Sequence, residues 1–418
     1  MESRIEGVFF YEWVINVMNA FVIGYPILGA AIRIIGCVYF GRYQRSLPRP
    51  ELTPKTTPLV TILVPAHNEE DTLRGAVASI AALHYHHFEV VLIDDKSDDQ
   101  TLAIMGELQR EYQGKMTVKI VPIEVNQGKA NALNQGLKVA TGEYVLGIDS
   151  DSILDYQSLS ELVKTLNSDE NIGAVAGKPV VRNRTTIMGR LQLLEYIGVI
   201  DIIKKAQAFL TGRITTVSGV IVAFRRQALE SVGGWNAAVM TEDIDITWRM
   251  YRHGWQVRYE PRAICWILVP ESIRNLIRQR QRWSRGGLEV LAGNRDVLLH
   301  GSWGKRALLS ETVISNVWAV CTALSMISWV LNLFFVHTVQ LDGDILLILL
   351  VISFTQFIIG FRASQDAAYL QWRDFLLVPV YILYYWMINL ISCIAAIISF
   401  VLDPDRVGTW TSPDRGLK

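Results

Sequence analysis

The sequence predicts an α/β domain with a mostly parallel, doubly wound sheet, combined with transmembrane and interfacial α-helices. Half of the 418 residues (50%) are hydrophobic, and the mean hydropathy of +0.25 exceeds what a soluble enzyme of this size needs to fill its core. Long apolar runs stand in the first and last parts of the chain. Between them, short β-branched runs alternate with segments of helical pattern, which indicates strands joined by crossover helices.

The N-terminal region predicts a membrane anchor. The stretch Val8–Phe40 is longer than the roughly 20 apolar residues that a helix needs to cross a bilayer. It is broken mainly by Gly24-Tyr25-Pro26 and Arg33, so we expect one long kinked helix. The absence of a small-residue cleavage site argues against a removable signal peptide. The arginines and prolines that follow indicate a cytoplasmic linker.

Four strands are expected in the central region, each followed by a segment long enough for a crossover helix: Val60–Val64, Val90–Ile93, Val118–Val121 and Tyr144–Ile148. Ligands of such sheets bind beyond the carboxyl ends of the strands. The acidic groups Asp94-Asp95 and Asp149-Ser150-Asp151 fall at these ends. The sheet therefore predicts a binding site at this edge.

The remaining sequence predicts helices at and in the membrane. Ile273–Leu291 alternates arginine with apolar residues, which is typical of an interfacial helix, and Thr185–Leu210 has a similar character. Three apolar spans close the chain, at about Thr312–Val336, Ile345–Phe361 and Phe375–Leu402.

Loop charges predict the orientation of these spans. The first loop holds Asp342 and Asp344 and should be external, whereas Arg362 and Arg373 place the second on the cytoplasmic side. The expected order is an anchor (1–45), a linker (46–58), the α/β domain (59–270), interfacial helices (271–310), three transmembrane helices (311–402) and a tail (403–418).

Charge and cysteine content exclude several classes of protein. Lys plus Arg and Asp plus Glu are equal at 40 each, so we expect no nucleic-acid partner. The cysteines Cys37, Cys265, Cys321 and Cys393 stand far apart and fit neither a zinc spacing nor a disulfide framework. We expect them to be reduced and buried.

Asp149 and Asp151 are the predicted metal ligands. Two carboxylates one residue apart on a strand-to-loop turn can hold Mg²⁺ or Mn²⁺, and the cation can clamp a diphosphate. The alternative is a solvated turn, because Asp-x-Asp is a frequent tripeptide. The other acidic residues nearby favour the metal site.

The second acidic group predicts a nucleotide contact. A carboxylate at the mouth of a buried strand can accept the imide N–H of a uracil, and we assign this role to Asp95. Asp98 and Asp99 are better explained as helix caps.

Four further donor-binding residues are expected in two segments. Pro65, Asn68 and Glu69 follow the first strand, and Lys129, at the end of Asn126-Gln127-Gly128-Lys129, offers a cation for the diphosphate. Both segments are also compatible with ordinary strand-to-helix turns.

Thr241-Glu242-Asp243 precedes a helix start and supplies the candidate general base, Asp243. For that role its carboxylate must be ionised at neutral pH and within hydrogen-bond reach of a sugar hydroxyl. The structural alternative is simple helix capping.

Gln279-Arg280-Gln281-Arg282-Trp283 places three side chains on one helical face by its spacing. Gln279 supplies an amide, Arg282 a diphosphate-binding guanidinium and Trp283 an aromatic platform for a sugar ring. A basic interfacial helix with a Trp anchor explains the same residues, and both interpretations can hold.

Other motifs are excluded. His84, His86 and His87 have no acidic or thiol partner nearby, so we expect no zinc site there. The sequence has no Walker phosphate loop, no G-x-G-x-x-G and no nucleophile elbow.

With these residues in order, the chain resembles the processive family 2 glycosyltransferases of GT-A fold, the group that holds cellulose, chitin and hyaluronan synthases. The resemblance runs from about Leu59 to Trp283 and rests on an ordered set: Asp95, Asp149-Ser150-Asp151, Thr241-Glu242-Asp243 and Gln279-x-x-Arg282-Trp283. One departure is Lys96, where relatives typically have Gly after the Asp pair.

A narrower similarity is to the bacterial synthases of the biofilm polysaccharide poly-β-1,6-N-acetylglucosamine. It is carried by four stretches: Thr216–Ile221, Tyr259–Ala263, Cys265–Glu271 and Ser412–Gly416.

The resemblance implies an inverting, processive transfer from UDP-N-acetylglucosamine (UDP-GlcNAc) to a growing polysaccharide, with Asp243 as base. The implied donor-binding residues are Pro65, Asn68, Glu69, Asp95, Lys129, Asp149, Asp151 and Arg282, and the acceptor-binding residues are Gln279, Trp283, Glu242 and Gly219. The protein would be a multi-pass protein of the bacterial plasma membrane with a cytoplasmic catalytic domain. A polymer path through the bilayer would be lined by Trp318, Trp329, Tyr384, Tyr385 and Trp386. A small membrane accessory subunit is a further implied partner.

Two alternatives stay open at this point. One is the same enzyme class with another product, such as hyaluronan, chitin, cellulose or a lipid-linked sugar. The other is a non-catalytic membrane subunit or channel with a degenerate transferase domain, against which the intact acidic set argues.

Overall fold

Residues 2–53, 57–335, 343–363 and 370–403 are described by the computed structural model. The strands of these segments are β1 (Val60–Ala66), β2 (Phe88–Asp95), β3 (Thr117–Ile123), β4 (Tyr144–Ile148), β5 (Ile153–Leu154), β6 (Ile172–Val181), β7 (Ile221–Arg225) and β8 (Gln256–Ile267). The four predicted strands are confirmed as β1 to β4; β1, β2 and β3 are a few residues longer than predicted, and β4 has the predicted bounds.

The strands form one sheet in the order β3-β2-β1-β4-β7-β6-β8-β5. β3, β2, β1 and β4 are parallel neighbours, as predicted. Beyond β4 the sheet is mixed: β7 runs antiparallel to both β4 and β6, β8 is parallel to β6, and β5 is antiparallel to β8. We call β1–β4 the parallel half and β5–β8 the mixed half.

The helices of the α/β domain are α2 (Leu73–Ala81), α3 (Thr101–Glu111), α4 (Lys129–Val139), α5 (Ser158–Asn167), α8 (Arg226–Ser231) and α9 (Glu242–Arg252). Side chains of one strand point alternately to the two faces of a sheet. Ile62 and Val64 accordingly lie in the core with residues of α2, α3 and α5, whereas Leu63 lies in a second core with residues of α4, α8 and α9. Helices therefore cover both faces, which confirms the doubly wound arrangement.

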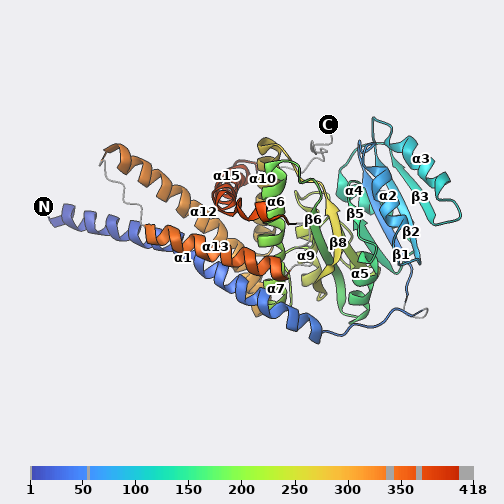
Figure 1. Ribbon diagram of the computed structural model, residues 1–418, viewed down its shortest axis with the longest axis horizontal. Coiled ribbons are helices and arrows are strands. Elements are labelled where there is room, and N and C mark those ends of the chain that lie inside the picture. Colours follow the sequence, from blue (N-terminus) through green and yellow to red (C-terminus); the bar gives the residue numbers. More distant parts are fainter. Residues whose placement is uncertain (1, 54–56, 336–342, 364–369, 404–418) are drawn as a thin grey trace.

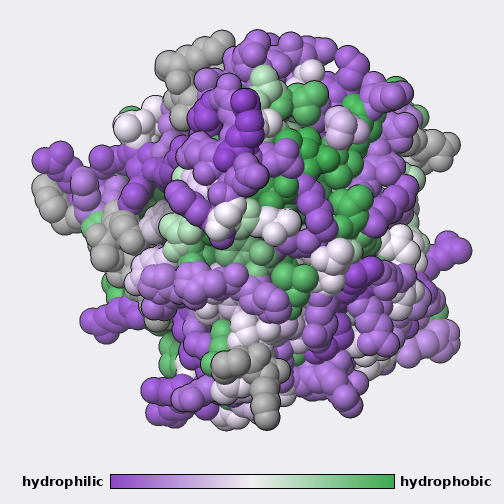
Figure 2. Space-filling view, turned by 90° about the vertical axis from the view of Figure 1, so that its right-hand side faces the viewer, coloured by the Kyte–Doolittle hydropathy of each residue, from purple (hydrophilic) through white to green (hydrophobic). Residues whose placement is uncertain are grey.

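The remaining helices are α1 (Glu2–Ser46), α6 (Ile187–Glu195), the π-helix η1 (Tyr196–Asp201), α7 (Ile202–Thr211), α10 (Ile273–Gly293), α11 (Arg295–His300), α12 (Trp303–Phe335), α13 (Gly343–Ala363), α14 (Trp372–Phe375) and α15 (Val378–Leu402). Figure 1 shows α1, α12 and α13 extending away from the sheet on one side, with α6, α7, α10 and α15 between them and the strands. The opposite end of the molecule is mostly hydrophilic, with apolar side chains gathered in a strip (Figure 2).

Three helices within the described residues are long and apolar enough to cross a membrane: Trp13–Ser46, Trp303–Asn332 and Val378–Leu402. The first is a single helix with Pro26 inside it, as expected for the anchor. Its backbone carbonyl at Val22 accepts a hydrogen bond of 2.9 Å from the indole of Trp318 on α12. Leu347–Ala363 of α13 is apolar but shorter, so its crossing of the membrane stays a prediction.

Helix α10, predicted to lie at the membrane interface, is attached to α15 by a buried arginine. Arg285 donates to the carbonyl oxygen of Ser399 at 2.9 Å and to its hydroxyl at 2.6 Å. The guanidinium also reaches Glu289 at 3.1 Å. The helix that carries the Gln-x-x-Arg-Trp motif thus moves together with a candidate membrane helix.

Some predictions fall outside the described residues. These are the loop acid Asp342, the stretch Ser412–Gly416 and nearly all of the tail 403–418. The four cysteines lie within the description and are free, with Cys37 and Cys265 buried and Cys321 and Cys393 half-buried.

Candidate active site

Lys129 joins the two halves of the sheet. It is the first residue of α4, and its ammonium group pairs with the carboxylate of Asp149, directly after β4. From the mixed half it meets Glu242 at 3.5 Å and donates to the carbonyl oxygen of Gly219 at 3.1 Å. Although burial disfavours the ammonium ion, the charges of Asp149 and Glu242 raise the pKa of Lys129 above its ordinary value. Lys129 is therefore a fixed positive charge between strand ends.

The two carboxylates of the Asp-x-Asp motif differ in their surroundings. The side chain of Asp149 is 27% exposed and faces Lys129, whereas Asp151 is only 7% exposed and accepts a hydrogen bond of 3.3 Å from the hydroxyl of Ser152. Among the residues that the structure describes, no group of three or more His, Cys, Asp and Glu side chains is placed to hold a metal ion. A Mg²⁺-type cation needs only one or two protein carboxylates when a diphosphate supplies further oxygens, so the pair fits such an ion.

Asp95 is completely buried at the end of β2. Its carboxylate accepts hydrogen bonds from the backbone N–H groups of Gly128 at 3.0 Å and Gln127 at 3.3 Å. Burial raises the pKa of Asp95, and these two N–H groups act against the rise. Asp95 thus fixes the loop that leads into Lys129, and its contact with a nucleotide stays a prediction.

The rim after β1 is held by hydrogen bonds between loops. Asn68 is exposed with a φ of 58°; its N–H donates to the hydroxyl of Ser97 at 3.0 Å, and its side-chain oxygen accepts from Asp98 N–H at 2.8 Å. Pro65 is buried within β1. Glu69 is buried and accepts from the Thr72 hydroxyl at 2.7 Å. Donor binding by Pro65, Asn68 and Glu69 stays a prediction, and for Glu69 the structure shows a local role at the start of α2.

The backbone conformation at Lys96 shows why relatives typically have glycine at this position. Its φ of 61° lies in the left-handed region, which glycine adopts without steric cost and other residues adopt at a cost. The loop keeps this conformation although the residue is a lysine.

The candidate base Asp243 lies in the first turn of α9 beside Glu242. One carboxylate oxygen accepts from the backbone N–H of Gly219 at 3.2 Å and the other from that of Ile244 at 2.9 Å. Asp243 is half-buried, but protein atoms surround its carboxylate, and this desolvation together with repulsion by Glu242 raises the pKa of Asp243 to about 6. The carboxylate is therefore mostly ionised at neutral pH, as a base must be.

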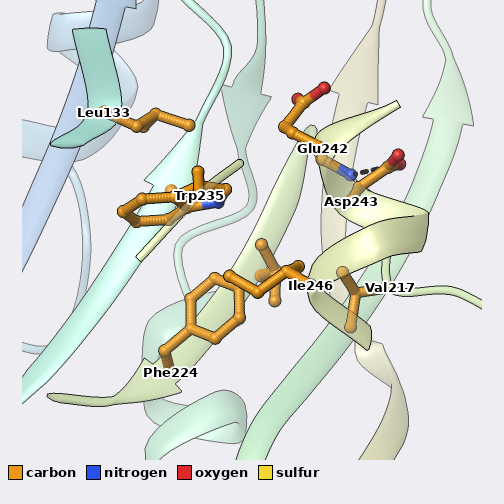
Figure 3. A pocket seen from close by; sticks show the side chains of 10 residues that line it. Leu133, Val217, Phe224, Trp235, Glu242, Asp243 and Ile246 are labelled. Atoms are coloured by element: carbon orange, nitrogen blue, oxygen red, sulfur yellow. Dashed lines mark hydrogen bonds between the residues drawn. The ribbon is translucent and has the colours of Figure 1, made fainter. Parts of the chain in front are cut away.

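Apolar side chains form the floor beneath these acids. Figure 3 shows the carboxylates of Glu242 and Asp243 pointing away from Phe224 and Ile246, with Trp235 at the side. Gly219 lies in the middle: a Cβ there would come within 3.3 Å of the Lys129 ammonium and 3.4 Å of a Glu242 oxygen. Glycine therefore leaves the space between the charges open.

Helix α10 packs directly on the Thr-Glu-Asp segment. A Cβ at Gly286 would lie 1.8 Å from the hydroxyl oxygen of Thr241, so only glycine allows this approach. Sequence reasoning missed this residue, and the pair Gly286-Gly287 within a long helical pattern was the available signal.

The motif residues of α10 have different environments. Trp283 is half-buried, with the guanidinium of Arg280 4.0 Å from its ring centre. Arg280 is itself buried and paired with Glu195 of α6 at 3.1 Å. Burial raises the pKa of Glu195, with Arg280 acting against it. Sequence reasoning also missed the contact of Arg280 with Trp283, because a buried ion pair between distant segments leaves no local pattern.

Within the described segments, two motif residues of α10, Arg282 and Gln279, lack the contacts that link Lys129, Asp149, Glu242 and Asp243. Arg282 is exposed and forms no ion pair with any residue in the described part of the chain. Gln279 is half-buried, and its side-chain oxygen has no hydrogen-bond partner among the described residues. Their donor and acceptor roles stay predictions.

The structure therefore gathers Lys129, Asp149, Glu242 and Asp243 around Gly219. Asp95 ends β2 and Asp151 follows β4, the two strands that flank β1. A cation, several carboxylates and a base candidate at the carboxyl edge of a parallel sheet suit the transfer of a group from a diphosphate.

Comparison with known proteins agrees with this class. The family model described as "Glycosyltransferase like family 2" matches residues 57–286. A poly-β-1,6-N-acetyl-D-glucosamine synthase of Staphylococcus epidermidis is 32% identical over 414 residues, covering 95% of this chain and 98% of the relative. A Staphylococcus aureus synthase of the same name is 34% identical over 312 residues, covering 73% of this chain and 74% of the relative.

The chain belongs to glycosyltransferase family 2, as its motifs indicated. Among solved structures, a mannosyltransferase from Pyrobaculum calidifontis in complex with GDP-Man and Mn²⁺ is similar, with a TM-score of 0.61 and 21% identity. The match covers 91% of this chain and 99% of that one, and it confirms the fold.

Proposed function

We propose that the protein polymerises N-acetylglucosamine from UDP-GlcNAc into a β-1,6-linked polysaccharide at the cytoplasmic face of a bacterial plasma membrane. The observation that carries the proposal is the convergence of Lys129, Asp149, Glu242 and Asp243 around Gly219. Similarity to the staphylococcal synthases over 95% of the chain supports the particular product.

The reaction would proceed by direct displacement. The 6-hydroxyl oxygen of the acceptor's terminal sugar attacks the anomeric carbon of the donor, and its proton passes to the carboxylate of Asp243. The bond from the anomeric carbon to the diphosphate oxygen breaks as the new bond forms, UDP leaves, and the configuration inverts from α to β. The pKa of about 6 suits Asp243 to this task, because a base is most effective when its pKa lies near the working pH.

Departure of UDP requires positive charge near the diphosphate. Lys129 would supply one charge, held in place by Asp149 and the Gly219 carbonyl. Asp151, with Asp149, would hold Mg²⁺ or Mn²⁺, which as a Lewis acid neutralises charge on the leaving diphosphate. Arg282, exposed on α10, would supply a further positive charge to the diphosphate.

The acceptor would rest against α10. Trp283, clamped by Arg280, would offer its ring to the terminal sugar, and Gln279 would bind a hydroxyl with its unpaired oxygen. The attachment of α10 to α15 through Arg285 would place the product beside the candidate membrane helices, which suits translocation of the polymer.

The test is product analysis with the full chain in lipid. Labelled UDP-GlcNAc, UDP-glucose and UDP-glucuronic acid are supplied separately and in pairs, and the polymer is digested with linkage-specific hydrolases. We expect incorporation from UDP-GlcNAc alone, with a product cut by a β-1,6-specific N-acetylglucosaminidase. A product cut by chitinase, or one that needs glucuronic acid, would reject the linkage and favour a chitin or hyaluronan synthase.

A further inference from the structure

A buried lysine, Lys204, contacts the turn that binds the candidate base Asp243. Lys204 of α7 is only 5% exposed, and its ammonium group donates to the hydroxyl of Ser218 at 2.6 Å. Its Nζ also lies 5.5 Å from the ring centre of Tyr259 on β8. Burying a lysine is unfavourable unless its charge is compensated, so its position requires an explanation.

The contacted turn belongs to the candidate active site. Ser218 directly precedes Gly219, whose N–H donates to Asp243 and whose carbonyl oxygen accepts from Lys129. The carbonyl oxygen of Ser218 closes the turn by accepting from Ile221 N–H at 3.0 Å. Two lysines from different helices therefore hold one short turn, and that turn orients the carboxylate of Asp243.

The charges around Lys204 show which nearby carboxylate is already compensated by other cations. Asp201 of η1 already pairs with Lys205 at 2.8 Å and with Lys178 of β6 at 3.0 Å, and it accepts from the Tyr259 hydroxyl at 2.7 Å. Although burial opposes ionisation, the two lysines lower the pKa of Asp201 to about 2. Asp201 is thus compensated without Lys204.

The remaining carboxylate that acts on Lys204 is that of Asp243. Burial lowers the pKa of Lys204 to about 8, while the charges of Asp243 and Asp201 oppose the decrease. Asp243 itself is repelled by Glu242 and attracted by Lys129; the attraction between Asp243 and Lys204 also favours the ionised carboxylate.

We propose that Lys204 is a positioning residue for the base: it fixes the Ser218-Gly219 turn that orients Asp243, and its charge favours the ionised carboxylate. The inference rests on the proposed role of Asp243.

The test is the pH profile of kcat/KM for UDP-GlcNAc in lipid-embedded full-length variants. In the wild type, activity should fall as pH drops through about 6, because Asp243 then takes up a proton. Lys204→Met removes a positive charge, so the pKa of the base rises and the acidic limb should move up by roughly one pH unit. Lys204→Arg keeps the charge and should keep the wild-type limb.

Ser218→Ala is the matched control, because it removes the hydroxyl and leaves the charge. It should lower kcat about fivefold with an unchanged acidic limb and unchanged KM for UDP-GlcNAc. A Lys204→Met enzyme with reduced activity but the wild-type limb would show that Lys204 only fills space and would overturn the proposal.

Two further comparisons distinguish the remaining outcomes. If Lys204→Met does not fold, Ser218→Ala decides, and an unaffected kcat rejects the role of the turn. Asp243→Asn is measured alongside: retained synthesis there refutes the base assignment itself, whereas its loss combined with an unshifted limb in Lys204→Met refutes only the role of Lys204.

Discussion

The parallel and mixed halves of the sheet contribute different chemistry to one site. The parallel half ends in Asp95, Asp149 and Asp151, with Lys129 at the start of the helix that follows β3. The mixed half contributes Gly219 before β7 and the acids at the start of α9. The halves meet where Lys129 contacts Glu242 and the Gly219 carbonyl.

We infer from the difference between the halves that one binds the donor and the other the acceptor. Strand ends of a parallel sheet converge on a ligand with little help from elsewhere, so the parallel half suits binding of a nucleotide diphosphate. The mixed half packs against α6 and α7, and α10 packs on α9; these helices join it to the candidate membrane helices (Figure 1). It therefore suits the acceptor of the proposed reaction.

The largest effect is expected from Asp243→Asn, which leaves the parallel half intact. An amide cannot take the proton from the acceptor hydroxyl, so kcat should fall by about a thousandfold or more. The rate of polymer formation from labelled UDP-GlcNAc measures this. Activity within tenfold of the wild type would reject Asp243 as the general base.

A smaller but still large effect is expected from Asp151→Asn in the parallel half. Loss of a carboxylate ligand weakens the proposed cation, so activity at low Mg²⁺ or Mn²⁺ should fall by roughly a hundredfold. Part of it should return as the metal concentration is raised, which a metal titration detects. Unchanged metal dependence would place the cation elsewhere.

Gly286→Ala tests the packing of α10 on the mixed half. The new Cβ would overlap the Thr241 hydroxyl, and such overpacking costs about 1–3 kcal/mol. We expect a lower thermal midpoint and about tenfold lower kcat. Gly287→Ala is the control, because its Cβ would meet Thr312 only at 3.9 Å; equal effects in both variants would contradict the close approach.

The smallest effect is expected from Lys96→Gly in the parallel half. Glycine accepts a φ of 61° without steric cost, so the free energy of unfolding should rise by about 0.5 kcal/mol, with activity unchanged. Chemical denaturation in detergent measures the change. A loss of stability would show that the lysine side chain, rather than the backbone, determines this loop.

The parallel half was predictable because its signals are local. Each of β1, β2, β3 and β4 contains a short run of mostly apolar residues, and acids end β2 and directly follow β4. Its site residues could therefore be placed on a common edge from the sequence.

The mixed half could not be predicted in the same way. β6 contains Gly173, Gly177 and Pro179, and its pairing with β8 shifts register at two points. β8 carries Arg258, Glu260 and Arg262 in its middle, so it is not a continuous apolar run like the strands of the parallel half. β5 has only two residues. Burial of Lys204 and the Arg280–Glu195 pair depends on contacts between distant segments, which no local pattern reveals.

The division of work between the halves is tested most directly by measuring UDP affinity and polymer synthesis on the same preparations of Asp151→Asn and Asp243→Asn. The account predicts that Asp151→Asn weakens both metal-dependent UDP binding and synthesis, whereas Asp243→Asn binds UDP like the wild type and makes no polymer. Synthesis by Asp243→Asn, or a loss of UDP binding in it as large as in Asp151→Asn, would contradict the account.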